Sequence, residues 1–118
     1  VKRMDKVDAH LLVLHEVLER WSGRGLLGLC PGELVTWFLD LIVFDLARLD
    51  AGDYGAIAAR VRDEFVGHLG QGWTDLSTKG AVCHVAHKLS NGSKISIVDA
   101  ARLYLATRGL KACVERFV

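Results

Sequence analysis

The chain has 118 residues, of which 51% are hydrophobic and 25% are charged, with a single proline. This composition is typical of an ordinary globular domain and excludes a disordered or collagen-like chain. Fifteen Lys and Arg side chains nearly balance fourteen Asp and Glu side chains, so the net charge of +1 excludes strong nonspecific attraction to nucleic acid or to a membrane surface.

The cysteines and the apolar segments indicate in which cellular compartment the protein resides. Cys30, Cys83 and Cys113 lie far apart and form no CxxC pair, which is typical of free thiols in a reducing cytosol. The stretch after the basic first residues is interrupted by polar residues and lacks the apolar run of a secretory signal. The most apolar segment, residues 34–47, is too short to cross a bilayer and holds two aspartates. We therefore expect a cytoplasmic protein that does not bind membranes.

Three helices are predicted in the first part of the chain. Apolar residues at spacings of three and four predict a helix over residues 5–22, which two glycines end. Pro31, which is favoured at the first helical position, begins a second helix that runs to about residue 49. Asp50 and Asp53 are candidate caps of a third helix over about residues 54–68.

Three shorter helices are predicted in the remainder. A fourth helix over residues 76–89 is stopped by Asn91 and Gly92. Ser96 and Asp99 form a capping box that begins a fifth helix to about residue 107. Gly109 separates it from a short helix or turn over residues 110–117. Residues 1–8 and 94–98 are compatible with extended ends, but no alternating strand is found.

Together these elements predict an all-α fold, a compact bundle or orthogonal array of five to six helices, with residues 1–118 as a single helical domain. The second helix is apolar over most of its circumference. It is therefore either the central helix of the bundle or a helix shared with a second chain in a homodimer.

Asp45 is the most informative position of the second helix, because it projects onto the apolar arc whereas Asp40 lies on the polar side. A carboxylate among apolar neighbours needs a partner, so we predict that Asp45 is buried or interfacial and paired with an Arg or a His of another helix. The alternative role is that of a ligand-binding or proton-transfer acid.

Glu64 and His68 stand one helical turn apart and are the second ligand-binding candidate, because a carboxylate at this spacing can orient an imidazole. The same spacing is also that of an ordinary structural pair.

Cys83, His84 and His87 share the face of the fourth helix opposite its apolar stripe and are weak metal candidates. A structural zinc site needs four ligands, and no second clustered pair is present, so we predict neither metal nor cofactor. Gly80 and Cys83 on the same face are small residues that favour close approach of another helix.

The C-terminal helix pair is compatible with a helix-turn-helix in which Arg108, Lys111 and Arg116 contact DNA. The fit is partial, because Tyr104 and Leu105 occupy the region where a tight motif favours a small residue.

No phosphate-binding loop, nucleophile elbow or metalloprotease motif is present, so the sequence gives no support for an enzyme. We expect a small interaction or adaptor protein that self-associates through an apolar helical surface. The alternatives are a DNA-binding regulator that uses the C-terminal helix pair and a small-ligand or metal-binding bundle built around Glu64, His68, His84 and His87. An exposed apolar patch favours a protein partner, whereas gathered basic side chains favour DNA.

Overall fold

The computed structural model describes residues 3–117 of the chain, with side chains for residues 4–116. This part contains six α-helices and one short 3-10 helix, and it contains no strand, which confirms the predicted all-α fold. The elements are α1 (Arg3–Gly23), α2 (Pro31–Arg48), α3 (Ala51–Leu69), η1 (Gln71–Asp75), α4 (Gly80–Asn91), α5 (Ile97–Arg108) and α6 (Leu110–Phe117).

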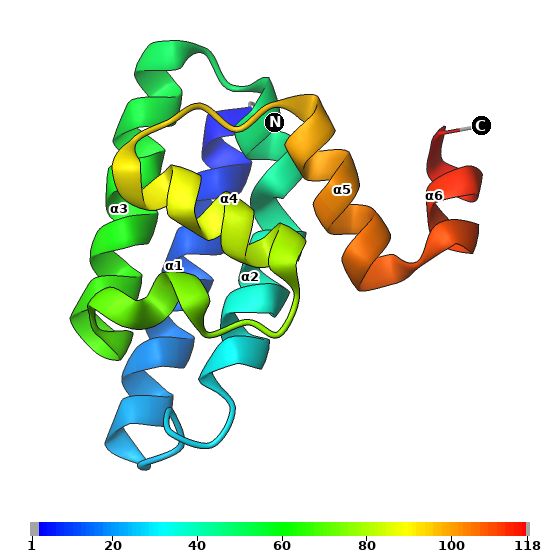
Figure 1. Cartoon of the computed structure of the whole chain (residues 1–118). Coiled ribbons are helices and arrows are strands. Elements are labelled where there is room, and N and C mark those ends of the chain that lie inside the picture. The colour runs from blue at the N-terminus through cyan, green and yellow to red at the C-terminus, as the bar shows by residue number, and fades with distance from the viewer. Residues whose placement is uncertain (1–2, 118) are drawn as a thin grey trace.

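The first three helices run alongside one another, and α4 crosses over them (Figure 1). α5 lies beside α2 and α4, whereas α6 stands at the edge of the molecule. Within the described chain, α5 is the only element whose backbone lies close to that of α6. The C-terminal helix is therefore an arm and not part of the bundle.

α2 is the central helix of the bundle. It packs against α1, α3, α4 and α5, which explains why apolar residues cover most of its circumference. Its buried Phe38 ring meets Phe65 of α3 edge to face, at a centroid distance of 5.9 Å, and Phe65 stacks on Trp73 at 4.9 Å. Only Trp37 and Leu41 among the large apolar residues of α2 are well exposed. The predicted central position is thus confirmed.

The local signals for helix ends are mostly confirmed. Asp50 caps α3 by accepting a hydrogen bond from the Asp53 N–H at 2.8 Å. Ser96 and Asp99 form the predicted capping box, with reciprocal bonds of 3.1 and 3.0 Å. Gly92 ends α4 in the left-handed conformation, with φ of 80°.

Two predicted boundaries are wrong. The fourth helix begins at Gly80 and not near residue 76, because the Ser77 hydroxyl accepts a hydrogen bond from the Lys79 N–H and holds residues 77–79 in a turn. The chain is also helical from Arg3 and not extended over residues 3–8. The rest of the predicted extended N-terminus, residues 1 and 2, lies outside the described residues.

Lys94 closes the other end of α2. Its ammonium donates hydrogen bonds to the carbonyl oxygens of Leu46 at 3.2 Å and Ala47 at 2.9 Å, and it lies 4.9 Å from the centroid of the Tyr54 ring. Burial lowers the pKa of Lys94 from its ordinary value. The contact joins the α4–α5 loop to the C-terminus of α2 and so fixes where α5 starts.

Candidate functional site

α5 carries two apolar faces. One face, which includes Ala100 and Leu103, is buried in the core. Nearly opposite, Ile97, Val98 and Leu105 project into solvent, and Val98 is 57% exposed. A surface helix ordinarily places polar residues on its outer side.

α6 is held against the body by its polar side. The Arg116 guanidinium lies over the rings of Phe44 and Tyr104, at 4.3 and 5.1 Å from their centroids. This orientation turns the apolar side of the helix outward, so that Leu110 is 70% exposed and Val114 is half exposed. The C-terminal helix is amphipathic, and its apolar side faces away from the core.

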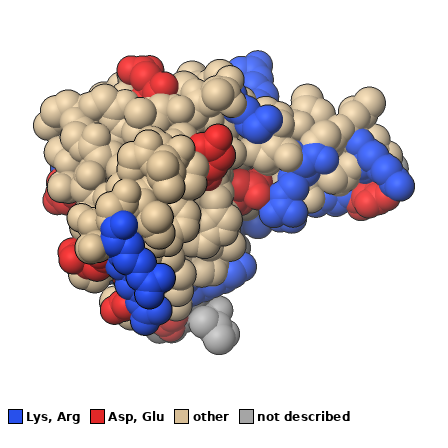
Figure 2. Space-filling view, turned by 90° about the horizontal axis from the view of Figure 1, so that it is seen from below, with Lys and Arg blue, Asp and Glu red and all other residues tan. Residues whose placement is uncertain are grey.

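The outer faces of α5 and α6 enclose a groove of about 340 Å³. We call the apolar residues of these two helices that are exposed or line the groove the arm surface; they are Ile97, Val98, Ala101, Leu105, Leu110, Cys113 and Val114. Arg102 is the one charged residue that lines the groove in the described chain. If a fully exposed aliphatic side chain presents on the order of 150 Å², this surface leaves roughly 400 Å² of apolar area in water, which is the size of the largest apolar patch on many monomeric proteins, and such a patch is often functional. Figure 2 shows the arm standing out from the body.

A second apolar groove, of about 370 Å³, lies between α1 and α2. It is lined by Val17, Trp21, Cys30, Glu33, Leu34 and Trp37. A shallower hollow on α1 shares Val17 with it and adds Leu12, Val13, Glu16 and Arg20. We call these two adjoining hollows the α1–α2 surface.

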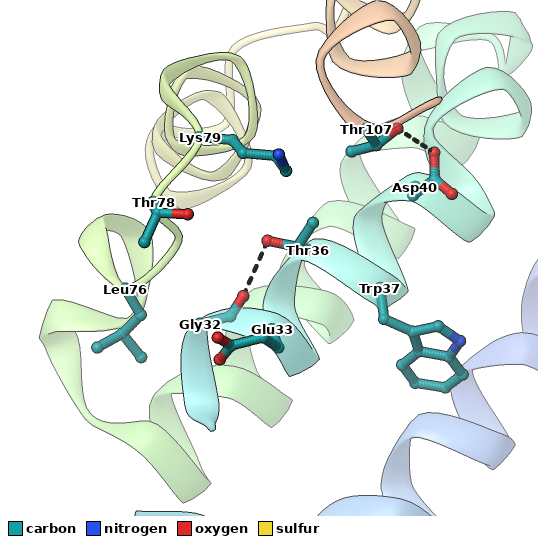
Figure 3. Close-up of a pocket in the computed structure, with 9 residues that line it drawn as sticks. All are labelled: Gly32, Glu33, Thr36, Trp37, Asp40, Leu76, Thr78, Lys79 and Thr107. Atoms are coloured by element: carbon teal, nitrogen blue, oxygen red, sulfur yellow. Dashed lines mark hydrogen bonds between the residues drawn. The ribbon is translucent and has the colours of Figure 1, made fainter. Parts of the chain in front are cut away.

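A polar cleft of about 290 Å³ separates α2 from the loop before α4 and from the end of α5 (Figure 3). Asp40 closes one side, where it accepts hydrogen bonds from the Thr107 hydroxyl at 2.8 Å and from Arg108 Nε at 2.9 Å. Glu33 of α2 and Lys79 before α4 line the cleft; Trp37 of α2 also lines it, but its ring points away from Lys79 (Figure 3). Asp40 thus lies among polar residues of α2, as predicted, but its side chain is only 13% exposed because Thr107 and Arg108 at the end of α5 cover it.

Asp45 is buried and paired with a residue of another helix, as predicted, but the ion pair at 3.5 Å is with the ammonium of Lys6 on α1 and not with the expected Arg or His. The Lys6 side chain is largely exposed. The pair joins α1 to α2 near one end of the bundle, and the contact that the structure shows is that of a structural ion pair.

Glu64 and His68 lie together with two residues of α1 that the sequence did not place there. His15 Nδ1 is 2.9 Å from Glu64, His68 Nε2 is 3.2 Å from Glu19, and His68 Nδ1 donates to the Glu64 carbonyl at 3.0 Å. Burial acts to lower the pKa of His68, but these hydrogen bonds and the two negative charges raise it above its ordinary value. The cluster links α1 to α3.

Cys83, His84 and His87 do not converge on a common point. His84 contacts Asp99 at 3.1 Å, His87 contacts Asp75 at 2.7 Å, and the Cys83 thiol donates to the Ser77 carbonyl. Across residues 4–116, no three His, Cys, Asp or Glu side chains are arranged to hold a metal ion.

Two further expectations concern α4. No atom of another helix lies within 4 Å of the position that a Cβ on Gly80 would take, so this face does not serve close packing within the chain, and its use in self-association stays a prediction. The ligand site built from Glu64, His68, His84 and His87 is also wrong as a single pocket, because its members belong to separate clusters with different partners.

The three candidate DNA-binding residues have different surroundings. Arg108 is paired with Asp40, whose negative charge and hydrogen bonds raise the pKa of the arginine, and Arg116 lies over two aromatic rings. Lys111 is exposed. Two of the three side chains therefore make contacts within the chain, and they do not form a free basic patch.

Asp99, which the sequence predicts only as part of the capping box, also makes hydrogen bonds outside its own helix. This buried carboxylate accepts hydrogen bonds from Lys88 Nζ at 2.6 Å and from the Ser96 N–H, and it contacts His84. Burial acts to raise the pKa of Asp99, but these hydrogen bonds outweigh it and hold the pKa far below its ordinary range. Its partners assign it to holding α4 against α5.

Comparisons with protein-family models, with curated proteins and with solved structures found no match to this chain. None of the helices within the described residues has the length and apolar character needed to cross a membrane.

Proposed function

We propose that this chain is a small cytoplasmic protein–protein interaction module that self-associates, and that copies contact one another through the arm surface. The observation that carries the proposal is the outward apolar side of α6 beside the outward apolar side of α5. Burial of such a surface is favourable by roughly 25 cal/mol per Å². The three free cysteines, Cys30, Cys83 and Cys113, suit a reducing compartment.

A second copy is the occupant that we propose, because the chain itself carries another apolar surface, between α1 and α2. The exposed residues of the arm surface also lie together on one side of the molecule and are not scattered singly, and clustered apolar patches are often functional.

Light scattering coupled to size exclusion tests the proposal. The wild-type chain, of 13.0 kDa, is expected to show a mass that rises above that of the monomer as the concentration increases. Leu110→Glu places a charge at the most exposed point of the arm without disturbing the core, and is expected to keep the chain monomeric. Ala56→Glu, on the exposed outer side of α3, is the matched control and should behave as wild type. A wild-type chain that stays monomeric at high micromolar concentration contradicts the proposal.

DNA binding is the second candidate function, and one observation favours it. Lys111 and Arg102 are exposed basic residues near the arm, and no ion pair joins either of them to another described residue. A mobility-shift assay at physiological salt, with Lys111→Ala as the variant, distinguishes this candidate: a sequence-dependent shift that the substitution abolishes supports DNA binding.

A further inference from the structure

We infer that the arm surface of one copy docks into the α1–α2 surface of the next copy, so that the chain assembles head to tail. The inference rests on the proposed self-association and names the surface that receives the arm. Two unlike apolar surfaces on one chain are each left in water in the isolated copy. One contact between unlike surfaces covers both of them.

The shapes of the two surfaces are complementary. α6 is a short helix that projects from the body and presents Leu110 and Val114 on its outer side, one helical turn apart. The α1–α2 groove is a hollow between two helices, with the indole rings of Trp21 and Trp37 in its lining. A groove between two helices is a common receptor for the apolar side of a third helix, and tryptophan is enriched among residues that dominate binding energy.

The charges at the two rims are also complementary. Glu33 lines the α1–α2 groove, and within the described chain no ion pair involves it. Glu16 and Arg20 of the adjoining hollow are paired with each other at 3.5 Å, which leaves Glu33 as the uncompensated charge. On the arm, Arg102 is the charged residue that lines the groove, and α6 carries the exposed Lys111 and Glu115 beside it. Attraction between Glu33 of one copy and Arg102 of the next favours this pairing over contact between two arm surfaces, which would bring two Arg102 side chains together.

The two surfaces also lie on separate parts of the molecule. Within the described chain, the backbone of α6 lies close only to that of α5, and the contact of Arg116 with Phe44 of α2 involves none of the residues that line the α1–α2 groove. A copy can therefore present its arm to one neighbour and its α1–α2 surface to another. Such a heterologous contact leaves one free surface of each kind at the two ends of a dimer, so growth continues unless a ring closes.

A mixing experiment with two blocked variants tests the inference. Leu110→Glu blocks the arm, and Trp37→Glu blocks the α1–α2 surface. Each variant alone lacks one of the two surfaces and is expected to be monomeric by light scattering, with a dissociation constant weakened at least about tenfold. Mixed in equal amounts, one variant still offers an intact arm and the other an intact α1–α2 surface. The mixture is therefore expected to give a species of twice the monomer mass that grows no further.

The outcomes separate the inference from the proposed function. If Trp37→Glu alone associates as the wild type does, or if the mixture stays monomeric, the arm does not dock into the α1–α2 surface, although self-association of the wild type still stands. If the wild type itself is monomeric, the proposed function fails as well. Val13→Glu, at an exposed position of α1 in the same surface, is a second blocking variant that leaves the tryptophans in place. It should complement Leu110→Glu in the same way, and melting curves for every variant check that the fold is retained.

Discussion

Removal of the Asp99 carboxylate is expected to be among the most destabilising polar substitutions in this protein. The side chain is 5% exposed, accepts hydrogen bonds from Lys88 and Ser96, and contacts His84. Loss of the hydrogen bond from the Ser96 N–H, one half of the capping box, costs about 1 kcal/mol, and loss of a charge-assisted hydrogen bond to a lysine adds about 1.5–3 kcal/mol. Because Lys88 and His84 reach solvent in part, they recover some hydration when the carboxylate is gone. We therefore expect Asp99→Ala to lower the free energy of unfolding by about 3 kcal/mol.

Asp99→Asn separates the charge from the cap. The amide oxygen still accepts from the Ser96 N–H, but the negative charge opposite Lys88 is lost, so we expect a cost of about 1–2 kcal/mol at neutral pH. Asp63→Asn, at a largely exposed aspartate on α3, is the control and should cost less than about 0.5 kcal/mol. Urea melts followed by circular dichroism give these values.

The effect of Asp99→Asn on stability also depends on pH. The pKa of Asp99 is lowered in the folded state, so its contribution to stability is complete above the unfolded pKa of about 3.9 and is lost as the pH falls from there toward the lowered folded value. The stability difference between wild type and Asp99→Asn should therefore be constant near neutral pH and shrink below about pH 4. Equal stability of Asp99→Ala and wild type at neutral pH would refute the reasoning.

Three further predictions concern the packing of the bundle. Gly32→Ala should cost at least about 2 kcal/mol in a thermal or urea melt, because the added Cβ would lie 2.2 Å from the carbonyl oxygen of Leu76. The Cβ of Gly80→Ala meets no atom within 4 Å, so this control should stabilise the fold by up to about 1 kcal/mol. Equal effects of the two substitutions would show that α2 and the loop before α4 do not meet as described. Lys94→Met should lower stability by about 1 kcal/mol, since it removes the cap at the end of α2, and unchanged urea midpoints would contradict that role. The pKa of His68 is raised in the folded state, so its contribution to stability is complete below the unfolded pKa of about 6.5 and is lost as the pH rises through the folded pKa. His68→Gln should therefore flatten the decline in stability that urea melts detect as the pH rises above about 6.5. An identical decline in the variant would rule out this role of His68.

The parts of the fold that depend on local signals could be predicted from the sequence. The stripe of α1 appears at spacings of three and four, because a helix brings such residues to one side. The capping box of Ser96 and Asp99 is a contact between residues three apart, and both bonds are present. The start of α4 at Gly80 was missed, because no capping side chain marks it and the preceding turn depends on the Ser77 hydroxyl.

The candidate site could not be predicted in the same way. The pairing of Asp40 with Arg108 joins residues 68 positions apart, and it depends on where α5 lies against α2. Likewise, Ile97, Val98 and Leu105 are apolar in the sequence, but a sequence alone does not say which of two apolar sides of a helix meets the core. The orientation of α6 is set by Arg116 over Phe44, a contact between the arm and the central helix that no local pattern signals.

Two native cysteines allow a direct measurement of self-association. Cys113 lines the arm groove and Cys30 lines the α1–α2 groove, whereas Cys83 lies on α4, outside both surfaces, and serves as the internal control. The rate at which each thiol is alkylated, followed by mass spectrometry over a series of protein concentrations, reports whether its surroundings become covered. We predict that the rate at Cys113 falls as the concentration rises, that Cys30 follows it, and that Cys83 does not change. A rate at Cys113 that is the same at low and high concentration would contradict self-association through the arm surface.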